Sequence, residues 1–210
     1  MFRILVGLIC LALAASGCYK NLPVGETDTI GTFFDADADF AGIQSYFLPD
    51  SVVHIGSSGF SLERSVDALI LARVAANLDN VGYRRVADLG LESADVLVLV
   101  YAVNETQWDA FRAISWWAVY SWVPGLDAFR GVPYQLDFSW RPREIYTYDG
   151  GSLFLVMVDL RRAVQTESMP AVWLTGISGL VVESPARVER RAVRNIDQAF
   201  VQSPYLRGTP

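Results

Sequence analysis

Two almost continuous apolar segments, residues 94–103 and 152–160, constrain the fold of this chain more than any other feature. Apolar runs of this length, without strict alternation, are typical of strands that are buried on both faces of a sheet. Such strands need other apolar elements to cover each face. We therefore expect both segments to lie at the centre of one sheet.

Two further segments, residues 61–80 and 184–200, carry apolar side chains at helical spacing. Gly82 follows the first segment, as glycine commonly follows a helix. Pro185 stands at the first position of the second segment, where a helix tolerates proline. Each segment predicts a helix with one buried stripe, and in the second we expect four charged residues to face outward: Arg190, Arg191, Arg194 and Asp197.

Residues 33–47 predict two short extended segments with a turn at Ala41 and Gly42, and residues 170–183 predict another strand. Glycines inside that strand predict a bulge or bend, at Gly176 and Gly179. The resulting order of elements predicts an α+β fold, with a mostly antiparallel sheet, two helices packed on one face and a long aromatic-rich insertion.

The N-terminal segment has the layout of a secretory signal peptide. One arginine precedes an apolar run that is too short to span a bilayer, and small residues follow it. The sequence Ala15-Ser16-Gly17-Cys18 resembles a bacterial lipobox, in which Cys18 receives lipid and becomes the mature N-terminus. Tyr19, rather than the aspartate associated with retention in the inner membrane, favours the outer membrane by analogy.

These features divide the chain as follows. We expect a signal peptide over residues 1–17, a lipidated Cys18 with a flexible tether over 18–32, a single domain over 33–204 and a tail over 205–210. The domain would face the periplasm or the cell surface, held at the membrane by its lipid.

Composition narrows the classes of partner. After removal of residues 1–17, the chain keeps 16 basic and 23 acidic residues, a net charge of −7. This balance disfavours nucleic acid as the principal partner. Cys18 is then the only cysteine, so no intramolecular disulfide can form and stability must come from the core.

Residues 106–148 form an insertion that holds five of the six tryptophans. Connections of this length are commonly functional, and the aromatic content argues against disorder. Two interpretations stay open: the rings form a docking surface, or the insertion folds back and buries them against the sheet. The residues that we expect to be most exposed or covered by a partner are Trp116, Trp117, Tyr120 and Trp122.

The acidic residues give no recognisable catalytic or metal site. Asp35, Asp37 and Asp39 alternate along the chain, but the segment lacks the glycine and glutamate of a calcium loop. We expect these three carboxylates to share one solvated face of a strand. Nothing in the sequence requires three other carboxylates to pair: Glu144, Asp149 and Asp159.

The remaining polar candidates also favour a non-catalytic protein. His54 is the only histidine, so a zinc site with several imidazoles is excluded, and we expect it at the surface of a Gly/Ser-rich loop. Arg161 and Arg162 are expected at a solvated strand end. We therefore predict no catalytic residue, no metal site and no cofactor.

Several short motifs resemble one family of bacterial lipoproteins, that of the domain of unknown function 4136. They occur in the expected order over residues 33–204: Asp37 to Tyr46, Gly82-Tyr83, Ala94 to Val98, Gly151 to Leu153 leading to Asp159, and Val172 to Gly176. The resemblance implies an envelope lipoprotein with an α+β domain. It implies no established activity and no catalytic residues.

The expected function is that of a membrane-anchored, non-catalytic lipoprotein. Its domain would bind another envelope component through the aromatic insertion or through an open sheet edge. The alternative is a carrier or sensor of a lipid or apolar small molecule in an aromatic-lined cavity. A hydrolase that uses carboxylates is a third hypothesis, for which the sequence supplies no positioned acid and base.

Overall fold

The computed structural model describes residues 28–56, 64–89, 93–104, 136–140, 152–166, 168–178 and 185–207. Its strands are β1 (Thr29–Phe34), β2 (Ser45–Phe47), β3 (Val53–Gly56), β4 (Arg84–Val86), β5 (Val96–Asn104), β6 (Leu136–Asp137), β7 (Ser152–Asp159) and β8 (Met169–Ser178). Its helices are α2 (Arg64–Val81), α4 (Leu160–Thr166), α5 (Pro185–Val201) and the short 3-10 helix η4 (Pro204–Arg207).

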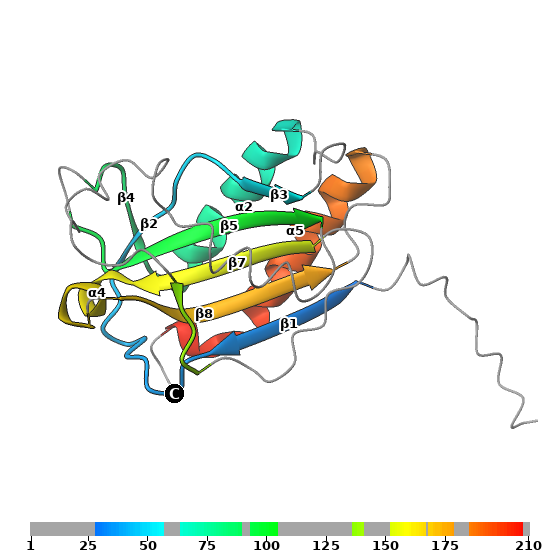
Figure 1. Ribbon diagram of the computed structural model, residues 1–210. Helices are drawn as coiled ribbons and strands as arrows, with labels where there is room; N and C mark the ends of the chain where they lie inside the picture. Colours follow the sequence, from blue (N-terminus) through cyan, green and yellow to red (C-terminus); the bar gives the residue numbers. More distant parts are fainter. Residues whose placement is uncertain are drawn as a thin grey trace, which may run out of the picture.

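One large, mostly antiparallel sheet organises these elements, as Figure 1 shows. The strand order is β1-β8-β7-β5-β2-β4, and the long strands β1, β8, β7 and β5 pair antiparallel. The short strands β2 and β3 both run parallel to β5, one at its beginning and the other at its end. The predicted class, α+β with a mostly antiparallel sheet, is therefore confirmed.

The central strands are buried on both faces, as the two apolar runs predict. Every side chain of β7 is buried, and so are the described side chains of β5 apart from the half-buried Ala102. Alternate residues of these strands belong to two separate apolar clusters, one on each face of the sheet. The sheet is thus the shared wall of two cores.

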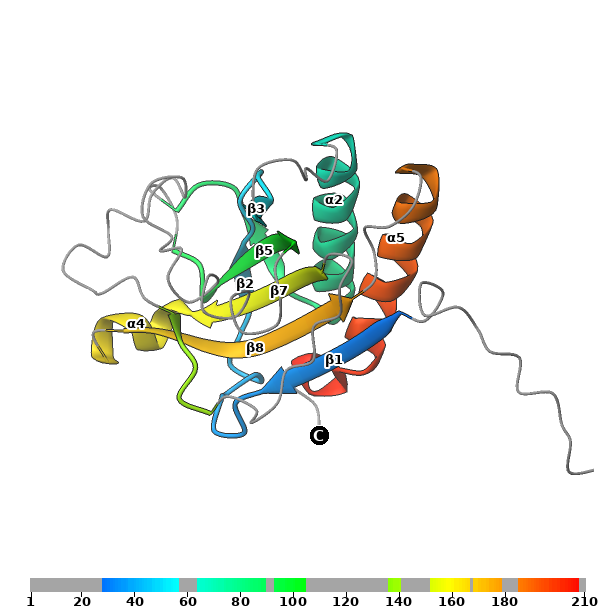
Figure 2. The ribbon, with the colours of Figure 1, turned by 45° about the vertical axis from the view of Figure 1, so that its right-hand side comes forward.

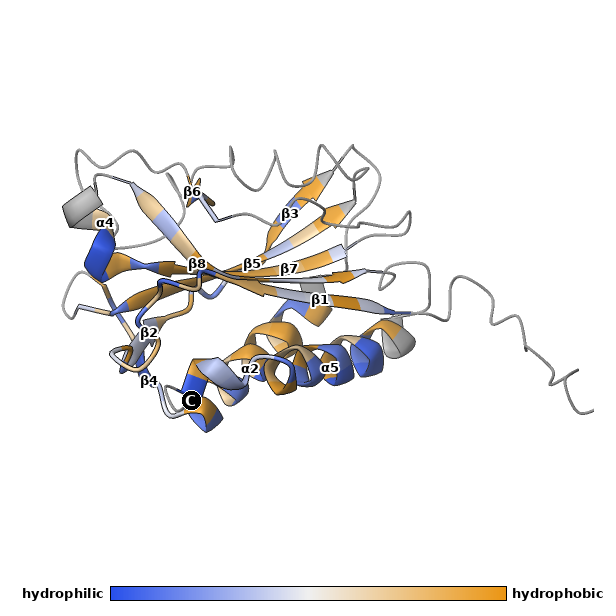
Figure 3. Cartoon of the chain, turned by 90° about the horizontal axis from the view of Figure 1, so that it is seen from below, coloured by the Kyte–Doolittle hydropathy of each residue, from blue (hydrophilic) through white to orange (hydrophobic). Residues whose placement is uncertain are grey.

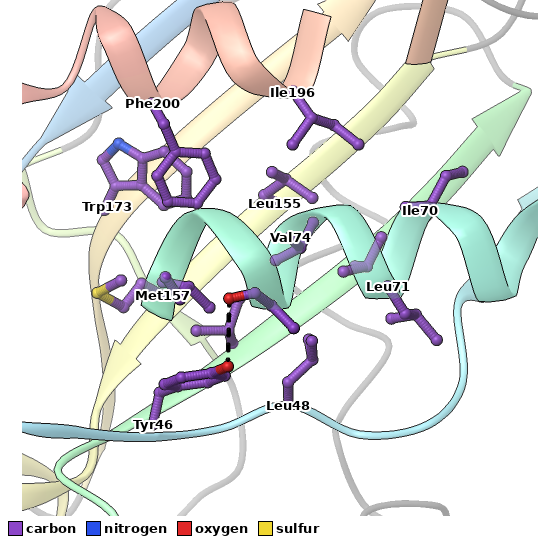
Figure 4. Packing of buried hydrophobic residues seen from close by; sticks show 14 of the residues in the cluster. Tyr46, Leu48, Ile70, Leu71, Val74, Leu155, Met157, Trp173, Ile196 and Phe200 are labelled. Carbon is purple, nitrogen blue, oxygen red and sulfur yellow. Dashed lines mark hydrogen bonds between the residues drawn. The ribbon is translucent and has the colours of Figure 1, made fainter. Parts of the chain in front are cut away.

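The first cluster joins the sheet to α2 and α5. Figures 2 and 3 show the two helices side by side on one side of the sheet. Figure 4 shows Val74 of α2 and Ile196 of α5 on either side of Leu155 of β7, with Trp173 of β8 against the ring of Phe200. These two rings lie 5.3 Å apart, and the Trp173 indole donates a hydrogen bond to the Ser203 hydroxyl at 3.0 Å.

The second cluster lies on the opposite face and includes residues of a third helix, α4, which the sequence does not predict. Leu160 and Ala163 of α4 pack there with Phe154 of β7. The part of the aromatic insertion that the structure describes also contributes, because Leu136 and Phe138 are buried in this cluster. Trp140 packs against it and donates its indole N–H to the carbonyl of Ala171.

Gly176 does not interrupt its strand, which corrects the predicted bulge at that position. It pairs with Gly31 on one side and Phe154 on the other, within an unbroken ladder. A Cβ at Gly176 would lie 3.1 Å from the Phe154 ring, closer than an ordinary contact, so glycine leaves room for the ring. The ladder shifts instead at Val172, which has no partner on β7, and Gly179 lies outside the described residues.

The start of the domain also differs from the prediction. Strand β1 begins at Thr29, so residues 29–32 belong to the sheet and not to the flexible tether. The Asp28 carboxylate accepts hydrogen bonds from Arg191, Arg194 and Asn195 of α5. Arg191 is therefore buried, with 8% exposure, although its place in the sequence predicts an outward side chain.

The outward face of α5 is also paired with α2. Arg73 of α2 donates to both carboxylate oxygens of Asp197, and Asn77 donates to the same carboxylate at 2.9 Å. Burial alone would raise the pKa of Asp197, but these hydrogen bonds outweigh it and hold the pKa below its usual value. The prediction that Asp197 simply faces solvent is thus incomplete, since it ties the two helices together.

We predict that Ile196→Ala lowers the free energy of unfolding by about 3 kcal/mol, because it leaves a cavity where α5 meets the sheet. Val201→Ala on the same helix is the matched control, since Val201 is 71% exposed and its truncation should change stability by less than about 0.5 kcal/mol. Urea unfolding of the full chain measures both values. Equal effects of the two substitutions would contradict this packing.

Candidate functional site

Three of the short motifs that are scattered along the sequence meet at one end of the sheet. Its residues come from three places along the chain. The first is the connection after β1 together with the first residue of β2, the second is the residue before β5, and the third is the end of β7 with the start of α4. The members of this polar cluster, which we call the motif end, are Asp35, Asp39, Gly42, Ser45, Asp95, Asp159, Arg161 and Arg162. It lies at the end of β1 that is opposite to Asp28.

Asp159 and Arg161 form the buried centre of the motif end. Asp159 is 1% exposed, and its carboxylate accepts hydrogen bonds from the Arg161 backbone N–H at 2.9 Å and from the guanidinium at 2.9 and 3.1 Å. It also accepts from the backbone N–H of Arg162 at 3.3 Å. Asp159 therefore caps the first turn of α4, and the buried carboxylate is neutralised by an arginine of the same helix.

Asp39 and Gly42 form a tight turn against the same arginine. The Asp39 carboxylate accepts the Gly42 N–H at 3.0 Å, and Arg161 donates to the Asp39 carbonyl at 3.1 Å. A Cβ at Gly42 would overlap the Asp39 carboxylate and lie 2.8 Å from Nη1 of Arg161. Glycine is thus the residue that lets the turn and the guanidinium approach each other.

Asp95 ties the start of β5 to the start of β2. Its Oδ2 accepts hydrogen bonds from the Gln44 N–H, the Ser45 N–H and the Ser45 hydroxyl, each at 2.9 Å. Burial alone would raise the pKa of Asp95, but these donors and the nearby Arg161 outweigh it and hold the pKa below its usual 3.8. Asp95 is therefore ionised at neutral pH and does not fit the role of a general acid.

Asp35 and Arg162 close the other side of the motif end. Arg162 Nη1 lies 3.0 Å from the Asp35 carboxylate, which also accepts the Asp37 N–H at 3.0 Å. Two predictions are therefore wrong. The acidic residues do not share one face of a strand, because β1 ends at Phe34 and Asp35 turns the chain, and the two arginines are ion-paired rather than simply solvated.

His54 also differs from its prediction as a surface residue of a loop. It lies on β3 and its Nε2 is 2.9 Å from the Asp67 carboxylate of α2. The side chains are 25% and 14% exposed, respectively. This pair joins the sheet to the helix far from the motif end.

The sequence-predicted interaction residues cannot be placed. Cys18, Trp116, Trp117, Tyr120 and Trp122 lie outside the described residues, as do two of the candidate carboxylates, Glu144 and Asp149. Within the described ranges, no group of three or more histidine, cysteine, aspartate or glutamate residues is arranged to hold a metal ion. In that same part of the chain, no helix is long and apolar enough to cross a membrane.

An aromatic group beside the motif end is not predicted by the sequence. Phe34 stacks on Tyr205 with ring centroids 4.0 Å apart, and Phe40 contacts the same tyrosine ring at 5.4 Å. Phe34 is 43% exposed. Tyr205 comes from η4, at the opposite end of the sequence, so no local pattern could have joined it to Phe34.

We predict that Gly42→Ala destabilises the protein by about 1–2 kcal/mol, because the added methyl displaces the Asp39 carboxylate from its hydrogen bond. The same substitution in an Asp39→Ala background should cost less, since the group that it displaces is gone. Urea unfolding of the wild-type chain, the two single variants and the double variant gives the coupling. Additive effects would show that the methyl acts elsewhere.

We also predict that Asp95 stabilises the fold in a pH-dependent way. Its folded pKa is lowered, so near pH 3.8 the unfolded chain binds a proton that the folded chain does not. The stabilisation is therefore present above this pH and is lost as the pH falls further. Asp95→Asn should cost about 1–3 kcal/mol at pH 7 and progressively less toward pH 3.

Unfolding curves from pH 7 to pH 3 measure this difference, with Asp50→Asn as an exposed control. A cost of Asp95→Asn that stays constant over this range would contradict the assigned network.

Comparisons with known proteins support the fold. The crystal structure of a DUF4136 family protein from Bacteroides thetaiotaomicron has a similar fold, with a TM-score of 0.64 and 24% sequence identity, over 87% of this chain and 98% of that chain. A search of curated protein sequences found no match.

Two other solved structures are more distant. The PelC dodecamer from Paraburkholderia phytofirmans has a TM-score of 0.41 and 12% identity, over 88% of this chain and 100% of that chain. A PDZ domain protein from Parabacteroides distasonis has a TM-score of 0.45 and 13% identity, over 85% of this chain and 36% of that chain.

The family model described as "Domain of unknown function (DUF4136)" matches residues 30–205. This range starts one residue after the beginning of β1 and ends in η4, so it covers nearly all of the described domain. The chain therefore belongs to the DUF4136 family.

Proposed function

We propose that this protein is an envelope lipoprotein of the outer membrane, anchored by lipid on Cys18, and that its domain binds another envelope component without catalysing a reaction. The observation that carries the proposal is the signal-like segment ending in Ala15-Ser16-Gly17-Cys18. Family membership is compatible with it, because the matched domain begins only after this segment.

The position of Asp28 supports a short tether between the proposed lipid on Cys18 and the domain. Residues 19–27 separate Cys18 from Asp28, and a chain of that length spans at most about 35 Å. Asp28 itself is held by α5, with its side chain 6% exposed. A lipid on Cys18 would therefore keep this end of the domain close to the membrane.

Metabolic labelling with a palmitate analogue tests the anchor. The wild-type chain and Cys10→Ser should be labelled and recovered in the outer membrane, because Cys10 lies in the part removed on cleavage. Cys18→Ser should lose the label. Labelling that persists in Cys18→Ser would overturn the assignment of the lipid site.

In-cell photo-crosslinking from position 116 or 117 tests the binding function. One dominant protein adduct would support a docking lipoprotein and identify its partner. Absence of an adduct from a folded protein would remove the aromatic insertion from the proposal, and ligand binding would then become the better hypothesis.

One observation favours that second candidate, a carrier of a lipid or apolar molecule. The Tyr101 hydroxyl is fully buried in the second cluster and has no hydrogen-bond partner among the residues that the structure describes. Burial raises the pKa of Tyr101 well above its usual value, so the hydroxyl stays a neutral donor. A buried donor without an acceptor is costly, and a polar atom of a bound ligand would satisfy it.

Native mass spectrometry of the detergent-extracted protein separates the two candidates. If a ligand accepts a hydrogen bond from the Tyr101 hydroxyl, the wild-type chain should retain the bound ligand and Tyr101→Phe should lose the ligand. Tyr46→Phe is the matched control, because the Tyr46 hydroxyl donates within the protein to Asp79 at 2.8 Å. If no ligand is bound, Tyr101→Phe should instead stabilise the protein by about 1 kcal/mol or leave it unchanged.

A further inference from the structure

Strand β1 is the outer strand of the sheet on one side, and among the described strands it pairs only with β8 (Figure 2). The ladder continues one residue beyond β1, where the Asp35 N–H donates to the Val172 carbonyl at 2.9 Å. In an antiparallel ladder, residues that bond to the neighbour alternate with residues that do not. The backbone groups of Ile30, Thr32 and Phe34 therefore point away from β8.

The side chains of these three residues all lie on the helix side of the sheet. Ile30 packs against the first cluster, and Phe34 contacts Tyr205 while keeping 43% of its surface exposed. The strand sequence, TIGTFF, contains no charged residue and no proline. Edge strands are commonly protected from pairing by such residues, so β1 is well suited to accept another strand.

We propose that β1 pairs antiparallel with β1 of a second copy of this chain, about a two-fold axis at Thr32. Thr32 would then face Thr32 of the second copy, and Ile30 would face Phe34. Only this centre lets the three outward-pointing residues bond with the same three residues of the copy. A slip by one residue would set outward-pointing groups against groups already bonded to β8.

The side chains fit this register. Each exposed Phe34 ring would be covered by Ile30 of the other copy, and aromatic rings opposite β-branched residues stabilise antiparallel pairs. Two threonines would meet at the axis, which is also a favourable cross-strand pair. The exposed apolar surface at the end of β1 would thus be covered by the beginning of β1 of the second copy.

The charges at the two ends of β1 favour the antiparallel arrangement. The beginning lies next to Arg194, whose side chain is 69% exposed, and the end leads into the exposed Asp37 and Asp39. The side chain of Asp39 is 70% exposed. Antiparallel pairing brings the basic end of one copy toward the acidic end of the other.

Cysteine crosslinking in the full chain tests this register. Thr32→Cys adds a thiol on the proposed axis, where directly opposite Cα atoms lie about 5.5 Å apart, a separation that a disulfide can bridge. Thr29→Cys is the matched control on the same strand. In the proposed register Thr29 faces Asp35 of the second copy, about 20 Å from the other Thr29.

After mild oxidation of membranes, Thr32→Cys should give at least five-fold more covalent dimer than Thr29→Cys or the wild-type chain. No dimer from Thr32→Cys, or equal yields from both variants, would overturn the proposal. The result does not depend on the anchor, because the wild-type chain measures any crosslink through Cys18.

A second measurement uses the mass of the detergent-extracted protein by light scattering. The wild-type chain should be a dimer at micromolar concentration. Thr32→Pro removes one outward N–H without touching the ladder to β8, so it should shift the protein toward monomer with an unchanged circular dichroism spectrum. A monomeric wild-type chain would overturn the proposal.

Discussion

Strands β5 and β7 bury their side chains on both faces of the sheet, and the other elements are arranged around this fact. Exposing either face of the sheet to water would be unfavourable, because each face carries a continuous apolar surface. Helices α2 and α5 contribute to the cluster on one face, and α4 with residues 136–140 contributes to the other.

The motif end joins loops that come from distant parts of the sequence and meet at one end of the sheet. Three connections end there, and each carries an acidic residue that accepts backbone hydrogen bonds: Asp39, Asp95 and Asp159. Arg161 contacts two of these loops at once. Charged groups with fixed hydrogen-bond geometry specify which loops meet, whereas apolar packing alone would tolerate several arrangements.

Much of the fold could be predicted from the sequence. The two apolar runs became β5 and β7, and the two periodic segments became α2 and α5 within a few residues of the expected bounds. Gly82 ends α2 with a φ of 108°, a conformation that favours glycine. These features depend on local periodicity and on termination signals, which neighbouring residues carry.

The candidate site could not be predicted in the same way. The motif residues were recognised as a family pattern, yet their separate positions gave no sign that they meet. The same limit explains Arg191, which looks solvent-facing on a helix and is buried because Asp28, 163 residues away, accepts its hydrogen bonds. Pairings of this kind depend on chain topology, which a local pattern does not encode.

The sequence by itself determined which segments form strands and helices, which faces are apolar, and that the class is α+β. The tertiary structure alone decided that β1 begins at Thr29, that Gly176 leaves room for the Phe154 ring, and that three of the motif segments form one polar cluster. The reason is physical: the spacing of apolar residues is a property of one segment, whereas an ion pair or a ring contact exists only between two.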